Sequence, residues 1–257
     1  PVRPLLDGVS AIASTEQLAS QVAWLHAHGV ATLFGFFGNQ DPKNSARVIA
    51  HAGAGGIGLP DRDYYTKQDS ASKALRTEYV AHIRRLFVLA GEADAAAERH
   101  ADEIMTLETA LASASLTNVQ RRDPNATYHL MSADSLVLLA PRFLWRDYFA
   151  GRGKSPDVVN VTQPGFFRAV NDLVASTPLE TWKAYLRWAV LADAAPTLSR
   201  AFVDEDFRFE KLLTGAKEQQ PRWKRCLAAT DRDLGDLLGK AYVAEAFPPK
   251  ARERALE

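Results

Sequence analysis

Histidines and carboxylates are the side chains that most often bind metals or transfer protons. The six histidines are His26, His28, His51, His82, His100 and His129. None belongs to a His-Glu-x-x-His helix, the spacing that turns two imidazoles towards one zinc ion. His26 and His28 are two residues apart, so on a helix they point to different sides. We therefore expect no zinc site within this chain.

One polar cluster has the composition of a weak metal site. His100, Asp102 and Glu103 lie within about one helical turn, and Glu98 precedes them. The same pattern is typical of a solvated helix face, which we favour. His82 falls in an apolar stripe, which favours a partly buried, hydrogen-bonded histidine over a metal ligand.

Motifs for nucleophilic catalysis and for nucleotide binding are missing from the sequence. No Gly-x-Ser-x-Gly elbow presents a serine. Cys226 is the single cysteine, and no histidine partner can be placed beside it. We interpret it as a small buried apolar residue. The glycine-rich stretch 53–58 has neither the Gly-Lys-Ser/Thr ending of a P-loop nor a dinucleotide fingerprint, so we expect no nucleotide there.

The composition is that of an ordinary globular protein. The chain has 257 residues, of which 47% are apolar and 24% charged. Lys+Arg and Asp+Glu number 31 each, so no basic field favours nucleic acid. No apolar run approaches the ~18–20 residues of a membrane span, and no signal peptide is visible. The chain begins at Pro1 and ends in a helix-favouring stretch, so we expect a piece of a longer protein.

Helical periodicity covers most of the chain. Ser14 and Gln17 form a capping-box pattern, and the segment 177–180 combines such a box with a proline. Ser132 and Pro164 mark two further helix starts. We predict helices over about 14–28, 75–90, 92–115, 132–139, 143–149, 197–213 and 221–246, and from 164, 177 and 248 onwards. The tryptophans, which fall at helical spacing, are expected in the core; they are Trp24, Trp145, Trp182, Trp188 and Trp223.

A short β element interrupts the helices. Residues 30–37 are apolar, β-branched and aromatic, which predicts a strand. Residues 38–45 have turn chemistry, and 47–51 could return as the second strand. Residues 157–161 predict a short extended segment. The fold class is thus mainly α, a multi-helix domain over 1–257 with a small β-hairpin near residues 30–51.

Several segments resemble the neprilysin and endothelin-converting-enzyme family of zinc metallopeptidases. Residues 56–65 read Gly-Ile-Gly-Leu-Pro-Asp-Arg-Asp-Tyr-Tyr, close to that family's G-L-G-L-P-x-R-D-Y-Y signature. Residues 41–45 are similar to its D-x-K-N-S turn. Residues 222–226 and 239–247 resemble its W-x-R-C and G-x-x-Y-V-x-x-x-F stretches. Their order and spacing agree with the family over essentially the whole chain.

The resemblance implies a function that this chain serves without chemistry of its own. The family's His-Glu-x-x-His helix and Asn-Ala-Tyr-Tyr strand do not occur here, so no catalytic or metal residue is carried over, and zinc is expected in the parent enzyme. What matches is a helical lobe that faces the catalytic lobe across a cavity and limits access by size. Its expected partners are that catalytic lobe and peptide substrates, in a periplasmic, secreted or cell-surface location.

The signature residues are expected to be structural, a proline-fixed turn whose charged groups hydrogen-bond locally. They are Gly58, Leu59, Pro60, Arg62, Asp63, Tyr64 and Tyr65, with Asp61 in the same turn. In the family, the cysteine matching Cys226 commonly pairs with one that precedes the region matching Pro1. The resemblance thus implies a disulfide from Cys226 to a cysteine outside this chain.

Two other hypotheses stay open at this point. The chain could be a stand-alone helical binding module without catalytic activity, acting through an exposed apolar surface. It could also be an independent enzyme, for which a buried cluster of His, Asp and Glu with shifted pKa values would be the evidence.

Overall fold

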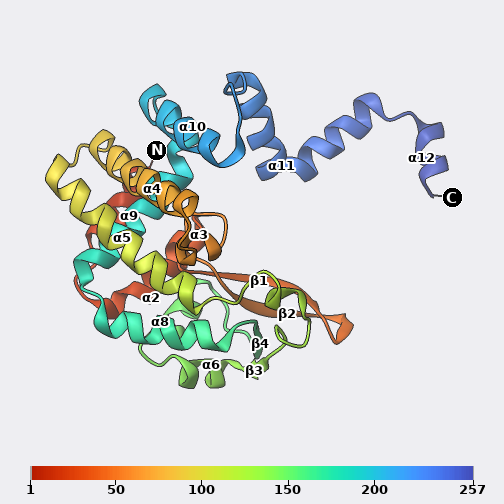
Figure 1. Ribbon diagram of the computed structural model, residues 1–257. Coiled ribbons are helices and arrows are strands. Elements are labelled where there is room, and N and C mark those ends of the chain that lie inside the picture. Colours follow the sequence, from red (N-terminus) through yellow and green to blue (C-terminus); the bar gives the residue numbers. More distant parts are fainter. Residues whose placement is uncertain (1, 257) are drawn as a thin grey trace. The chain divides into compact units, whose positions relative to one another are not determined.

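The computed structural model describes residues 2–256 and is mainly helical with one small sheet, as predicted (Figure 1). The chain divides into two compact units, Pro1–Leu213 and Thr214–Glu257. Whether residues 1–257 form a single lobe is not decided by this division, so the single lobe stays a prediction. No helix of the described chain is both long and apolar enough to cross a membrane.

The sheet of the first unit has four strands in the order β1-β2-β4-β3. They are β1 (Phe34–Asp41), β2 (Asn44–Ala54), β3 (Leu130–Ser132) and β4 (Val158–Val161). β1 pairs with β2 antiparallel, β2 with β4 parallel, and β3 with β4 antiparallel. β1 is therefore an edge strand, and its hairpin with β2 extends away from the helices in Figure 1.

The predicted hairpin is confirmed, but its boundaries are shifted. Residues 38–41, predicted as turn, belong to β1, and the turn itself is only Pro42-Lys43. Lys43 N–H donates to Asp41 Oδ1 at 2.9 Å and stabilises this tight turn. The strands could extend through polar residues because the tip of the hairpin is exposed on both faces, so no apolar alternation is required there.

The described residues of the first unit include ten helices, several of which pack against one another. They are α1 (Arg3–Ser10), α2 (Leu18–Ala27), α3 (Asp63–Thr66), α4 (Ser70–Leu89), α5 (Asp94–Ala114), α6 (Ala133–Leu139), α7 (Trp145–Gly151), α8 (Pro164–Ser176), α9 (Leu179–Ala194) and α10 (Arg200–Thr214). α4 packs against α5, and α9 packs against α1, α4 and α5. The sequence did not predict α1.

Two of the predicted helix caps are wrong. A 3-10 turn at Thr15–Gln17 moves the start of α2 to Leu18, beyond the reach of the Ser14 side chain. Gln17 Oε1 instead accepts from the N–H of Ala13 at 2.6 Å. α9 begins one residue later than predicted, with Pro178 at the N-cap, so the residue before it makes no cap.

The other predicted helix starts and stops described here are confirmed. Ser132 Oγ accepts from the N–H of Ser135 at 3.1 Å, and Pro164 occupies the first turn of α8. Gly29 and Gly91, which follow α2 and α4, have φ of +83° and +93°, the left-handed conformation that favours glycine. Side-chain caps and glycine stops can be recognised from sequence because both act within a few residues.

Aromatic side chains fill the core between β1 and helices α7 and α8. Phe34 contacts five other rings at centroid distances of 5.2–5.7 Å; they are His26, Phe143, Trp145, Tyr148 and Phe167. Trp145, Trp182 and Trp188 are buried, as predicted, and Trp24 is partly buried. His82 is buried as well, with Nδ1 2.8 Å from Glu205 Oε1, which confirms a hydrogen-bonded histidine on the apolar stripe.

The second unit consists of α11 (Arg222–Ala246) and α12 (Pro249–Leu256). α11 buries none of its residues and is kinked at Leu234, next to Gly235. Trp223, predicted in the core, is 63% exposed. Cys226, interpreted as buried, is a free and exposed thiol. Both interpretations were wrong because an apolar stripe becomes buried only where a second layer covers it.

Candidate functional site

The signature loop leaves β2 and leads into α3 through two glycines that cannot be replaced without strain. Gly56 has φ +73°, and a Cβ there would lie 2.4 Å from the hydroxyl of Tyr185. A Cβ on Gly58 would lie 2.0 Å from the hydroxyl of Tyr79. The glycines of the signature therefore allow the backbone to approach buried tyrosine hydroxyls closely.

The side chain at the centre of these contacts is Glu108, from α5. It is 1% exposed and accepts hydrogen bonds from three side chains and one backbone amide. Tyr65 donates to Oε2 at 2.5 Å, and Tyr79 to the same oxygen at 2.8 Å. Trp188 Nε1 donates to Oε1, and Gly58 N–H to Oε2, both at 3.2 Å. One carboxyl thus joins the signature loop, α3, α4, α5 and α9.

Burial raises the pKa of Glu108 to about 7, because removal from water disfavours the charged carboxylate. The hydrogen bonds from Tyr65 and Tyr79 act in the opposite direction and hold the pKa below what burial alone would give. The pKa values of both tyrosines are raised, first by burial and then by the adjacent Glu108. Both tyrosines are therefore neutral near pH 7, where the Glu108 carboxyl is at the midpoint of its titration.

The remaining signature residues make local contacts. Leu59 is buried, and its N–H donates to the Tyr65 hydroxyl at 2.9 Å. Asp61 Oδ1 accepts from the N–H of Asp63 at 2.7 Å, and Arg62 Nε donates to the Ala112 carbonyl at 3.3 Å. After Pro60, Tyr64 lies partly buried, and its carbonyl accepts from Arg76 at 2.7 Å. A structural role for these residues stays a prediction, which the variants below test.

The Glu108 cluster is suited to holding elements together rather than to transferring protons. Its carboxyl oxygens are occupied by four donors, and those donors are tyrosine, tryptophan and backbone groups. No histidine or aspartate is among them, although such a cluster would be the evidence for an independent enzyme. We therefore assign Glu108 a positioning role.

The residues considered as metal ligands make other contacts. His100 Nδ1 lies against Glu92 Oε1, and Glu92 forms an ion pair with Arg187 at 3.2 Å. Glu103 accepts from the Thr181 hydroxyl at 3.1 Å. Between residues 2 and 256, no three His, Cys, Asp or Glu side chains are grouped so that they could hold a metal ion.

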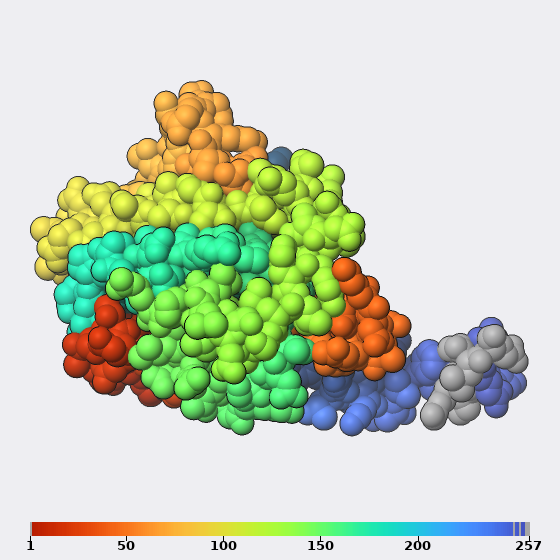
Figure 2. Space-filling view, turned by 90° about the horizontal axis from the view of Figure 1, so that it is seen from below, coloured from red at the N-terminus to blue at the C-terminus, as the bar shows by residue number. Residues whose placement is uncertain are grey.

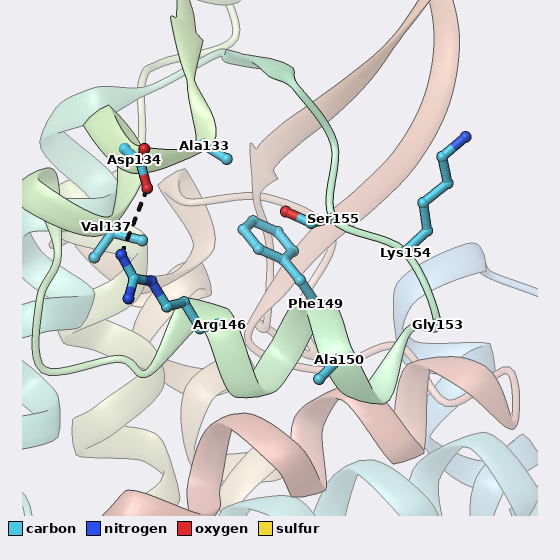
Figure 3. A pocket seen from close by; sticks show the side chains of 9 residues that line it. All are labelled: Ala133, Asp134, Val137, Arg146, Phe149, Ala150, Gly153, Lys154 and Ser155. Carbon is cyan, nitrogen blue, oxygen red and sulfur yellow. Dashed lines mark ion pairs between the residues drawn. The ribbon is translucent and has the colours of Figure 1, made fainter.

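The described part of the first unit has a pocket of about 750 Å³ between α5, α8 and α9 and two smaller ones of similar size. One, of about 410 Å³, is bordered by the signature glycines, Glu108, Tyr185 and Trp188. The other, of about 430 Å³, lies between α6, α7 and the loop at 153–155 (Figure 3). In Figure 3 Arg146 points towards Asp134, at 3.7 Å, but both side chains are more than four-fifths exposed. An ion pair in water positions a ligand poorly.

Sequence reasoning missed the residues that complete the Glu108 cluster, although one signal was present. Glu108 follows Leu107 and lies one turn from both Ile104 and Leu111, inside the predicted apolar stripe of α5. A carboxylate on such a face must be hydrogen-bonded when buried. Its donors come from three distant segments, so their identity depended on the tertiary fold.

Comparisons with known proteins identify the family. The model of peptidase family M13 matches residues 1–257. The chain belongs to peptidase family M13. Endothelin-converting enzyme 1 of Rattus norvegicus is 30% identical over 245 residues, 92% of this chain and 32% of that protein. Neprilysin-3 of Drosophila melanogaster is 28% identical over 235 residues, 87% of this chain and 30% of that protein.

Solved structures agree with this M13 assignment. The open state of the Mycobacterium tuberculosis zinc metalloprotease Zmp1 superposes with a TM-score of 0.93 at 35% identity, covering 99% of this chain and 40% of that one. PepO of Lactobacillus rhamnosis shares the fold, with a TM-score of 0.83 at 18% identity, over 100% of this chain and 41% of that one. The resemblance predicted from the signature is thus confirmed. The chain spans about a third of the length of the curated M13 relatives.

Proposed function

We propose that this chain is a non-catalytic part of a zinc metalloendopeptidase that hydrolyses peptides. In this proposal the chain forms a helical lobe that encloses the substrate cavity opposite the catalytic lobe, and it limits access by size. The observation that carries the proposal is a match to family M13 over residues 1–257 in a sequence without a His-Glu-x-x-His motif. A steric role needs rigid helices and no reactive group. The Glu108 carboxyl agrees with such a role, because it accepts hydrogen bonds from tyrosines that link neighbouring helices.

The same proposal places the parent enzyme outside the cytoplasm and gives Cys226 a partner. The thiol is exposed on α11, so it is sterically available to a second cysteine from the remaining polypeptide. A disulfide requires an oxidising compartment, such as the periplasm or the cell exterior. Non-reducing mass analysis of the longer polypeptide tests this point, and a free thiol there would remove the support for export.

A peptidase assay tests the proposed function. The 257-residue chain and the longer polypeptide encoded by the same gene are each incubated with two substrates. One is a quenched fluorescent peptide, and the other is a folded protein of similar amino-acid composition. We expect no cleavage by the chain alone. The longer polypeptide should cleave the peptide, lose that activity with a chelator and leave the folded protein intact. Zinc-dependent turnover by the isolated chain would contradict the proposal.

A binding module is the second candidate, and the exposed face of α11 favours it. Large apolar side chains there are 53–63% exposed; they are Trp223, Leu227, Leu237 and Tyr242. An apolar surface of this kind often marks an interaction site. Sedimentation at micromolar concentration distinguishes the two candidates, because a binding module should self-associate or bind a separate protein even when the longer polypeptide shows no peptidase activity.

A further inference from the structure

β1 leaves one edge of the sheet without a neighbouring strand, and the hydrogen bonds of β2 show which backbone groups face that edge. The carbonyl of Ala52 accepts from Thr162 N–H at 2.9 Å, on the β4 side of β2. Bonding direction alternates along an antiparallel strand, so the adjacent His51 faces β1. Its partner in the register, Phe37, therefore bonds to β2.

The residues on either side of Phe37 direct their N–H and C=O groups towards the open edge. These residues are Phe36 and Gly38. The other outward-facing amides of β1 already have acceptors. Phe34 N–H donates to the Thr32 carbonyl at 2.6 Å, and Gln40 N–H donates to Asn39 Oδ1 at 2.9 Å. Over residues 2–256, the outward groups of Phe36 and Gly38 have no hydrogen-bond partner.

This open edge lacks the features by which natural sheets avoid unwanted pairing. Residues 34–40 include no charged residue and no proline, and the register is regular up to Gln40. Phe37 is 51% exposed and stacks on His51. Figure 2 shows the hairpin, in orange-red, at the surface of the molecule. Long, uncharged edge strands with exposed aromatic side chains readily accept another strand.

The pocket of about 410 Å³ lies at the beginning of this strand. It is bordered by Phe34 and Gly35 at the start of β1, and by Tyr185, Trp188 and Ala192 of α9. Strand residues rise about 3.3 Å each, so a strand paired at Phe36 would reach the pocket within two or three residues. A mostly apolar border of this size suits one large apolar side chain.

We propose that an extended segment of the peptidase polypeptide outside this chain pairs with β1 at Phe36 and Gly38 and places one apolar side chain in this pocket. This inference rests on the proposed function, because it requires the longer polypeptide. The chain covers 32% of endothelin-converting enzyme 1 and 40% of Zmp1, so the relatives have ample further chain to supply such a segment. A tethered segment also covers the edge continuously, which a transient substrate peptide cannot do.

Hydrogen exchange tests the pairing without any variant. The amides of Phe36 and Gly38 are compared in the 257-residue chain and in the longer polypeptide, with the Phe37 amide as an internal control already bonded to β2. We expect Phe36 and Gly38 to exchange at least about tenfold more slowly in the longer polypeptide, and Phe37 to change little. Equal exchange of Phe36 and Gly38 in the two proteins would overturn the inference.

A matched pair of variants in the longer polypeptide tests whether backbone pairing is responsible. Gly38→Pro removes the outward N–H without removing a bond to β2. Gly38→Ala retains the N–H, and its Cβ meets only Val48 Cγ1, at an ordinary 3.8 Å. The proline variant should restore fast exchange at Phe36, and the alanine variant should not. Identical exchange in the two variants contradicts strand pairing.

Filling the pocket tests the second contact. Ala192→Phe should speed exchange at Phe36 in the longer polypeptide, and unchanged exchange would remove the pocket from the proposal. Slow exchange of the Phe36 and Gly38 amides could also appear only after a substrate peptide is added, or only in a dimer of the 257-residue chain. Either result would assign the edge to that other occupant and overturn the inference. Peptide hydrolysis is measured on the same samples. Hydrolysis with unprotected amides refutes only this inference, whereas protected amides without hydrolysis refute only the proposed function.

Discussion

The two units of this chain contain similar amphipathic helices, but the apolar side chains are buried in the first unit and exposed in the second. In the first unit, Trp182 on α9 is fully buried. In the second unit, Trp223 on α11 is 63% exposed, and no residue of α11 is buried. Both tryptophans lie at helical spacing with other apolar residues. The difference shows that periodicity determines which side of a helix is apolar, whereas a covering layer determines whether that side is buried.

The first unit supplies its own covering layers. α9 is packed by α1, α4 and α5, and Glu108 connects four of the surrounding segments. The described part of the second unit consists of α11 and α12, which are too few to enclose a core. The first unit therefore has a closed core, which the described helices of the second unit lack.

The largest expected difference is between two tryptophan truncations. Trp182→Ala should lower the free energy of unfolding by about 3–5 kcal/mol, since it leaves a cavity in a closed core. Trp223→Ala should change it by no more than about 0.5 kcal/mol, because the side chain is exposed. Urea unfolding followed by circular dichroism measures both. Similar losses in the two variants would show that α11 is covered within this chain.

Stability should fall as the pH rises from about 4.5 to about 7, through the titration of Glu108. Its pKa in the folded protein is about 7, above the ordinary 4.5, so the folded state holds a proton that the unfolded state has released. A raised carboxyl pKa therefore stabilises the fold below this window and contributes nothing above it. The shift corresponds to about 3 kcal/mol at most. Urea unfolding at pH 5 and pH 8 measures the change.

Glu108→Gln is the control for that pH dependence. The amide cannot ionise, so the difference in unfolding free energy between pH 5 and pH 8 should become smaller in this variant. A wild-type protein that gains stability over this range relative to the variant would mean that Glu108 is ionised in the fold at low pH. That result would contradict the assignment of a neutral, buried carboxyl.

A pair of glycine substitutions should have opposite signs. Gly58→Ala places a Cβ 2.0 Å from the Tyr79 hydroxyl and should cost about 1–3 kcal/mol through overpacking. Gly239→Ala, inside α11, meets nothing within 4 Å and should stabilise the helix by about 0.5–1 kcal/mol. Thermal unfolding by circular dichroism compares them. A neutral Gly58→Ala would show that the signature glycine is not required by packing.

The smallest perturbation is alkylation of Cys226. The thiol is exposed, so iodoacetamide should modify it in the native 257-residue chain as fast as in urea. In the longer polypeptide, the proposed disulfide should block modification until a reductant is added. Mass spectrometry before and after reduction reads out both states. Modification of the unreduced longer polypeptide at the same rate would refute the disulfide.

Most local signals were interpreted correctly from the sequence, apart from the caps predicted at Ser14 and Thr177, whereas distant contacts were not. The hairpin, the glycine stops after α2 and α4, and the signature loop depend on neighbouring residues, and each was recognised. Glu108 was passed over because its four donors are 29 to 80 residues away along the chain. The exposure of Cys226 was also missed, because no local pattern reports the absence of a covering layer.

The zinc content of the purified polypeptides decides whether this chain is a non-catalytic part of a zinc peptidase. The 257-residue chain and the longer product of the same gene are each dialysed against zinc, washed with buffer and analysed for bound metal per polypeptide. We expect tightly bound, stoichiometric zinc in the longer polypeptide and none in this chain. Stoichiometric zinc held by the 257-residue chain alone would contradict it.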